Sequence, residues 1–137
     1  MTVKEYLSQG YRINEMINCK IMQAQSLRDL ATNVTALLSH SPVSGTRNTH
    51  RMESTITKMV DLETEIYADI DTLVDLQAEI GSTIKLVACE ESRTLLELRY
   101  LGFKHWSEVA KSMKYSKQRI LQLHNIALEK ISIPAKN

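Results

Sequence analysis

The sequence is poor in the residues that interrupt helices or build an aromatic core. Its 137 residues include two Pro, four Gly, five Tyr, one Phe and one Trp. Pro and Gly disfavour helix most strongly, whereas Leu, Met, Glu, Lys and Gln favour it, so this composition predicts helix over nearly the whole chain. The core must then be built mainly from aliphatic side chains. The sequence therefore predicts an all-α protein.

Cysteine and long apolar runs are scarce as well. The two cysteines, Cys19 and Cys89, lie far apart in the sequence, as is usual for a protein whose thiols stay reduced. No apolar run approaches the ~18 residues of a membrane span, and no basic segment followed by an apolar one begins the chain. We expect a cytoplasmic protein with neither a membrane span nor a signal peptide.

The residue patterns that support catalysis or metal binding are also missing. The four His and two Cys contain no pair at zinc-ligand spacing, and the Glu-x-x-His motif of helical di-metal proteins is absent. There is no Gly-rich phosphate loop and no Ser-His-Asp or Cys-His arrangement. We expect no enzyme activity, no cofactor and no metal site.

Charge is divided unevenly along the chain. Residues 1–89 carry eight Lys and Arg against eleven Asp and Glu, whereas residues 90–137 carry nine against five. A positive C-terminal part is what contact with nucleic-acid phosphates requires. The acidic stretch between Lys58 and Lys85, which has no basic residue, is either a solvated helix face or a docking face for a basic partner.

Two long segments have the heptad spacing of a coiled-coil seam. The first series is Val3, Tyr6, Gly10, Ile13, Ile17, Lys20, Ala24, Leu27, Ala31, Val34 and Leu38. The second series is Ile56, Met59, Glu63, Ile66, Ile70, Leu73, Gln77, Ile80, Ile84 and Val87. Residues 39–50 between them lack periodicity and are rich in turn formers. We predict a long antiparallel helical hairpin, coiled-coil-like, as a first domain over residues 1–88.

The apolar stripe on this hairpin is wider than a two-helix seam. Side positions are apolar too, namely Leu7, Ile21, Val60, Tyr67 and Val74. A two-helix hairpin cannot bury so wide a stripe by itself, so either the C-terminal part or a second chain must cover it. We expect a homodimer through residues 1–87, with Lys20, Glu63 and Gln77 in the seam setting the register or the oligomeric state.

Residues 89–137 form the second predicted domain, which contains a helix-turn-helix. Its first helix carries leucines at helical spacing and ends at Gly102, for which we predict a left-handed conformation. A short helix follows from about Trp106 to Met113. Lys114 and Tyr115 then form a tight turn, and Ser116 caps the last helix.

The last helix has one apolar and one polar face. The residues that must point inward are Ile120, Leu123, Ala127, Leu128 and Ile131. The residues left on the opposite face, predicted to contact bases, are Lys117, Gln118, Leu121, Gln122 and Asn125. The residues at the edges of that face, predicted to contact phosphates, are Lys104, His105, Lys114 and Arg119. The pattern indicates double-stranded DNA as the partner, because a helix fits the major groove.

Residues 93–131 resemble region 4 of the bacterial sigma-70 family, the module that contacts the −35 promoter element. The shared residues are Leu95-Leu96-Glu97-Leu98-Arg99-Tyr100, Glu108-Val109-Ala110, Ser116, Arg119-Ile120, Gln122 and Ala127-Leu128-Glu129-Lys130-Ile131. The whole layout is similar to small phage and prophage regulators of the ArpU type. Three positions depart from the family pattern: Lys114 stands where Gly is frequent, His105 where Ser or Thr caps, and Leu121 where a basic residue is common.

The resemblance implies a sequence-specific DNA-binding transcription regulator encoded by a phage or prophage, with RNA polymerase as a possible partner. It does not imply a complete sigma factor, because a −10-binding region needs basic and aromatic residues, whereas residues 1–87 are acidic and nearly free of aromatic residues. Two alternatives remain open. One is a DNA-packaging protein like the phage small terminases, and the other is a polymerase-binding adaptor that does not contact DNA bases.

Overall fold

The computed structural model describes residues 1–40 and 45–134, with side chains for 1–33 and 50–134, and all its regular secondary structure there is helical. The elements are α1 (Val3–Leu7), α2 (Gln9–His40), α3 (Gly45–Lys85), α4 (Glu90–Leu96), the π-helix η1 (Glu97–Leu101), α5 (Trp106–Met113) and α6 (Lys117–Glu129). The predicted all-α class is confirmed. None of the described helices combines the length and apolarity that crossing a membrane would need.

The chain divides into two compact units. The α2–α3 unit comprises residues 14–72, and the terminal unit comprises residues 1–13 and 73–137. This division differs from the boundary predicted at 88/89, because α1 and the last part of α3 belong to the same compact unit as α4, α5 and α6.

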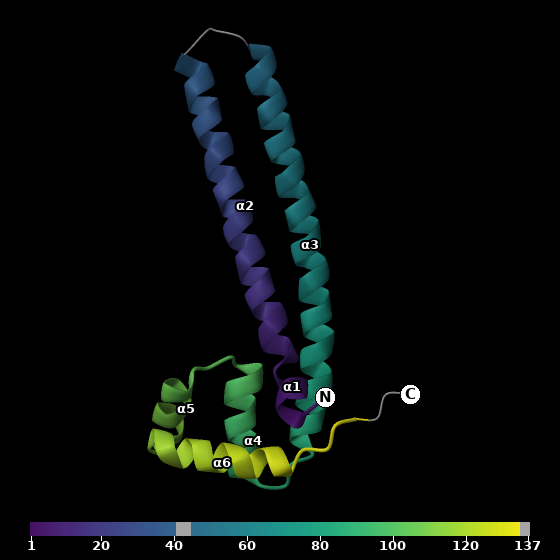
Figure 1. Cartoon of the computed structure of the whole chain (residues 1–137), viewed down its shortest axis with the longest axis vertical. Helices are drawn as coiled ribbons and strands as arrows, with labels where there is room; N and C mark the ends of the chain where they lie inside the picture. The colour runs from purple at the N-terminus through teal and green to yellow at the C-terminus, as the bar shows by residue number, and fades with distance from the viewer. Residues whose placement is uncertain (41–44, 135–137) are drawn as a thin grey trace. The chain divides into compact units, whose positions relative to one another are not determined.

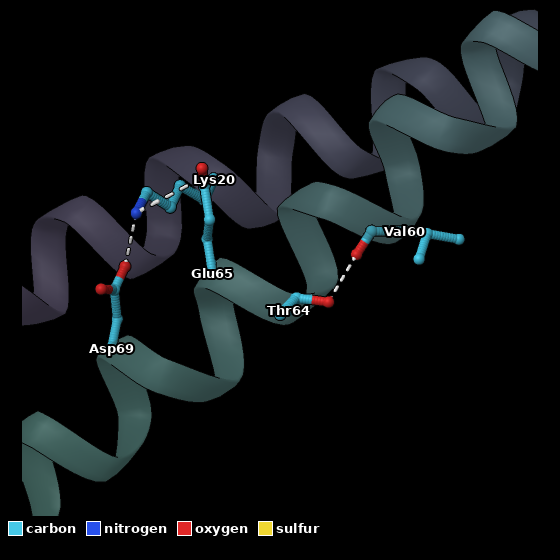
Figure 2. Close-up of polar contacts among 5 residues, drawn as sticks. All are labelled: Lys20, Val60, Thr64, Glu65 and Asp69. Atoms are coloured by element: carbon cyan, nitrogen blue, oxygen red, sulfur yellow. Dashed lines mark hydrogen bonds and ion pairs between the residues drawn. The ribbon is translucent and has the colours of Figure 1, made fainter.

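In the α2–α3 unit the two helices run antiparallel (Figure 1). Lys20 Nζ lies 2.7 Å from Asp69 Oδ2 and 3.7 Å from Glu65 Oε2 (Figure 2). Eight residues further along α2, Arg28 pairs with Glu63, at 3.6 Å. The partner on α3 moves backward as α2 advances, which fixes the antiparallel direction. The seam prediction for Lys20 agrees with this pairing, since its cation is half-buried beside two carboxylates.

Fewer apolar residues are buried between α2 and α3 of this unit than the heptad pattern predicted. Ile17 and Ile66 are buried, but Ile56 and Ile70, which the heptad pattern assigns to the seam, are exposed. An α-helix of 3.6 residues per turn drifts away from a strict seven-residue repeat, so positions at its edge turn outward. The side positions Ile21 and Tyr67 are exposed as well.

The helix boundaries also differ from the prediction. The predicted loop at 39–50 is largely helical, because α2 continues to His40 and α3 begins at Gly45, while residues 41–44 lie outside the described part of the chain. A polar segment can extend a helix without an apolar stripe of its own. At the other end the predicted single helix from Val3 is interrupted at Ser8, which closes α1.

The core of the terminal unit contains the inward-facing residues predicted for both ends of the chain. Its buried members are Tyr6, Leu7, Ile80, Ile84, Val87, Leu95, Leu96, Tyr100, Val109, Ala110, Ile120, Leu123, Ala127 and Ile131. Leu128 packs partly buried against them. The hydroxyl of Tyr6 lies 3.2 Å from Thr83 Oγ1 and donates to Glu79 Oε1 at 3.3 Å, which ties α1 to the end of α3.

The left-handed conformation predicted for Gly102 is wrong. Gly102 has φ −86°, and Phe103 is the residue with a positive φ, at 56°. Glycine is required at 102 for a different reason, since a Cβ there would lie 2.9 Å from the carbonyl oxygen of Leu98. The helix ends through a π turn, in which the Gly102 N–H donates to the Glu97 carbonyl at 2.9 Å, and this geometry left no signal in the residue pattern.

Candidate nucleic-acid interface

The turn between α5 and α6 is built around Lys114. This residue is left-handed, with φ 61° and ψ 38°. The next N–H, of Tyr115, donates to the carbonyl of Ala110 at 3.0 Å, the six-to-one bond of a Schellman motif. Lys114 therefore adopts the conformation that glycine usually takes at this place, and its side chain is exposed beside the start of α6.

Ser116 begins α6 as predicted. Its backbone is extended, and its hydroxyl accepts a hydrogen bond from the Arg119 N–H at 3.2 Å. This cap satisfies one of the free N–H groups of the first turn and fixes the direction in which the helix starts. By contrast, His105 caps α5 with its backbone alone, because its side chain makes no capping hydrogen bond.

The two faces of α6 differ sharply in burial. Ile120, Leu123, His124 and Ala127 are buried against the terminal unit, where α6 packs on both α4 and α5. The five residues predicted to contact bases are all exposed: Lys117, Gln118, Leu121, Gln122 and Asn125. Their spacing of three and four residues places them together along the open side of the helix.

The residues predicted to contact phosphates are exposed too. Lys104 and His105 lie in the segment between η1 and α5, Lys114 lies in the turn, and Arg119 lies in the first turn of α6. Arg119 donates to the Gln122 side-chain oxygen at 3.5 Å. Within the described residues, the ion pairs involve Lys20 and Arg28, and none of these four residues takes part in one.

Glu91 of α4 adds a negative charge to this surface that was not predicted from the sequence. A hydrogen bond to the Glu91 carboxylate raises the pKa of Tyr115, whereas Arg119 acts in the opposite direction. The hydrogen bond places the Glu91 carboxylate at Tyr115, in the turn that precedes α6. Spacing along the sequence gave no signal for this, because Glu91 and Tyr115 are 24 residues apart.

A polar and aromatic cluster supports α6 from beneath. The Tyr100 hydroxyl and His124 Nε2 share a buried hydrogen bond of 2.6 Å. The Trp106 ring meets the His124 ring edge to face, with centroids 4.5 Å apart, and the Arg99 guanidinium lies 4.5 Å from the Trp106 ring centroid. Arg99 also donates to the Lys104 carbonyl at 2.9 Å, so the segment before α5 is held to the same cluster.

Burial sets the protonation of this cluster. It lowers the pKa of His124 to about 4, with smaller contributions from the Lys4 and Arg99 charges. It also raises the pKa of Tyr100 to about 12, against the effect of Arg99. Both groups are therefore neutral at pH 7. His124 was not among the core residues predicted from the sequence, although it follows Ile120 by four residues and precedes Ala127 by three.

The exposed side of α6 combines amide, cationic and aliphatic side chains. The described residues include no group of three or more His, Cys, Asp or Glu side chains placed to hold a metal ion. What the surface offers is amides, cations and one leucine on the open side of a capped helix. Comparison of the chain with protein-family models, with curated proteins and with solved structures finds no match.

Proposed function

We propose that residues 93–131 form a helix-turn-helix and that the protein is a sequence-specific DNA-binding transcription regulator. The single observation that carries this proposal is the capped helix α6, which buries Ile120, Leu123 and Ala127 while leaving a complete row of amide, cationic and aliphatic side chains exposed. The resemblance to sigma-70 region 4 and to the ArpU type of phage regulator supports the same function. The proposal is for a regulator and not a complete sigma factor.

The chemistry of the row fits the edges of base pairs in the major groove. A glutamine amide can both donate to and accept from adenine, and an aliphatic side chain can contact the thymine methyl group. In this proposal Gln118, Gln122 and Asn125 contact base edges, and Leu121 contacts a methyl group. Lys117 lies at the N-terminal end of the helix, where major-groove helices approach the bases most closely.

Four residues are assigned to the phosphates on either side of the groove. Lys104, Lys114 and Arg119 supply positive charge, and the exposed His105 supplies a hydrogen-bond donor. Arg119 must give up its 3.5 Å contact with Gln122 for both to bind DNA. That contact is long for a hydrogen bond and is exposed to water, so breaking it costs little.

The proposal includes a homodimer through residues 1–87. Contact with RNA polymerase is the step by which binding would change transcription. The acidic stretch of α3 between Lys58 and Lys85 could bind a basic surface on such a partner. Each of these is separate from the base-contacting role of α6 and can be tested alone.

Binding to fragments of genomic DNA, followed by sequencing, would identify the preferred site. On that site Gln122→Ala should weaken binding by roughly 1–3 kcal/mol, with little change on random duplex. Arg119→Ala should weaken both and reduce the slope of log K against log salt by about one. Gln23→Ala, which removes an exposed amide from α2, is the matched control. Equal losses for Gln122→Ala on the two duplexes would contradict the proposal.

A further inference from the structure

The helix α3 carries a second, largely apolar seam that is exposed along one side of its contact with α2. Ile56, Val60, Glu63, Tyr67 and Ile70 follow one another at steps of four, three, four and three residues. The four apolar members are 48%, 53%, 68% and 38% exposed in chain order. Heptad spacing on an exposed face is what a partner helix packs against. We call these five residues the outer seam.

The α2 helix extends the same face. Ile21, which is 49% exposed, lies seven residues before Arg28 and so occupies the same position around α2. Arg28 reaches Glu63 of the outer seam at 3.6 Å. Ile21 and the outer seam therefore lie on the same side of the α2–α3 unit as this ion pair.

The face is close to electrically neutral. Its one carboxylate, Glu63, has Arg28 of its own chain as a counter-ion. Glu65 and Asp69 lie at the other edge of the helix pair, where Lys20 binds them (Figure 2). A basic partner would be drawn to that other edge, whereas the outer seam offers no net charge to attract or repel.

The residues beside the seam present no unsatisfied hydroxyl group. Thr64 Oγ1 donates to the Val60 carbonyl at 3.0 Å (Figure 2), and Thr57 Oγ1 donates to the Glu53 carbonyl at 2.9 Å. Each hydroxyl is thus satisfied within α3. Packing a helix against these positions would bury methyl groups without leaving a donor unpaired.

We propose that the outer seam binds the outer seam of a second copy of the chain, with the two α3 helices antiparallel. In that register Val60 lies opposite the partner subunit's Ile70, and Glu63 lies opposite the partner subunit's Tyr67. The tyrosine hydroxyl then donates to a carboxylate that already has its counter-ion. The seam is complementary to itself under a two-fold axis, as an isologous dimer requires. This specifies the dimer included in the proposed function.

The oligomeric state of the full chain tests the surface. Sedimentation velocity and light scattering at micromolar concentrations should give a dimer. Tyr67→Glu adds a charge to the seam beside Glu63, so we expect the dimer dissociation constant to rise at least about tenfold. Met22→Glu is the matched control, since Met22 is 70% exposed on α2 and lies outside the face. A monomeric chain, or equal effects of the two variants, overturns the proposal.

Cross-linking tests the register without depending on a destabilising charge. In a chain with Cys19→Ser and Cys89→Ser, the variants Val60→Cys and Ile70→Cys should form a disulfide-linked dimer on oxidation when they are mixed. Each variant alone should give little, because like positions lie apart in the antiparallel register. Strong cross-linking of either alone, or none in the mixture, overturns the register. None of these measurements contains DNA, so their failure would leave the base-contacting role of α6 standing, and loss of that role would leave the dimer standing.

Discussion

Replacing Lys114 by Gly should stabilise the protein while weakening its binding to DNA. Lys114 has φ 61° and ψ 38°, a conformation in which an L-residue brings Cβ too close to a carbonyl oxygen. That conformation costs roughly 1–2 kcal/mol for an L-residue. Glycine avoids the clash but loses about 0.5–1 kcal/mol more backbone entropy on folding. The balance is a gain of about 0.5–1 kcal/mol in the free energy of unfolding.

The same substitution removes a cation from the proposed phosphate-contacting edge. The slope of log K against log salt should therefore fall by about 0.9. Lys114→Ala is the control that separates the two effects, because it removes the charge and keeps the left-handed backbone of an L-residue. It should lose the same salt dependence and gain no stability.

Urea denaturation followed by Trp106 emission and by far-UV circular dichroism measures the first effect, and duplex titrations at several salt concentrations measure the second. The reasoning about strain is refuted if the Gly variant is no more stable than the Ala variant. The reasoning about phosphate contact is refuted if both variants keep the salt slope of the unchanged chain.

Three further perturbations test the terminal unit. Burial lowers the pKa of His124 from about 6.5 in the unfolded chain to about 4 in the folded protein. The free energy of unfolding should therefore be full above pH ~6.5 and should fall as the pH drops from ~6.5 to ~4. The urea midpoint of His124→Phe should change less over the same pH range. Trp106→Ala should lower the free energy of unfolding by roughly 3 kcal/mol, and a loss below about 1 kcal/mol in denaturation followed by circular dichroism would show that its ring contacts contribute little. Glu91→Gln should strengthen duplex binding about two- to fivefold at low salt by removing a charge beside the turn, and an equal gain for the distant Glu53→Gln would contradict that local explanation.

The sequence predicted the local structure of the C-terminal helices well because short-range rules determine it. The bounds of α5, the Ser116 cap and the burial of Ile120, Leu123 and Ala127 in α6 follow from capping preferences and helical spacing, whereas the burial of His124 was not predicted. The burial of Leu7 in the core was not predicted, because the heptad pattern placed Leu7 at a side position of the seam.

Features that the sequence did not predict depend on contacts between distant residues or on small energy differences. Phe103, and not Gly102, has the positive φ, and its ring lies beside Tyr11 with centroids 6.2 Å apart. No residue near Phe103 in the sequence indicates that contact. The proximity of Glu91 to Tyr115 and the pairing of Tyr100 with His124 likewise require the folded chain. The continuation of α2 and α3 into polar residues shows that a helix can outlast its apolar stripe.

The π turn at Glu97–Leu101 has a consequence for changes in chain length. The Gly102 N–H donates to the carbonyl of Glu97, five residues earlier, whereas in an α-helix it would donate to the carbonyl four residues earlier. The turn therefore holds one residue more than an α turn. The surplus residue is absorbed locally, and the residues on either side keep their faces. A deletion of one residue at Arg99 or Glu97 would convert the turn to regular α-helix without rotating the next part of the chain by the usual ~100° per residue. The loss of one residue, which rotates the faces of a regular helix, should therefore be tolerated at this point in the chain.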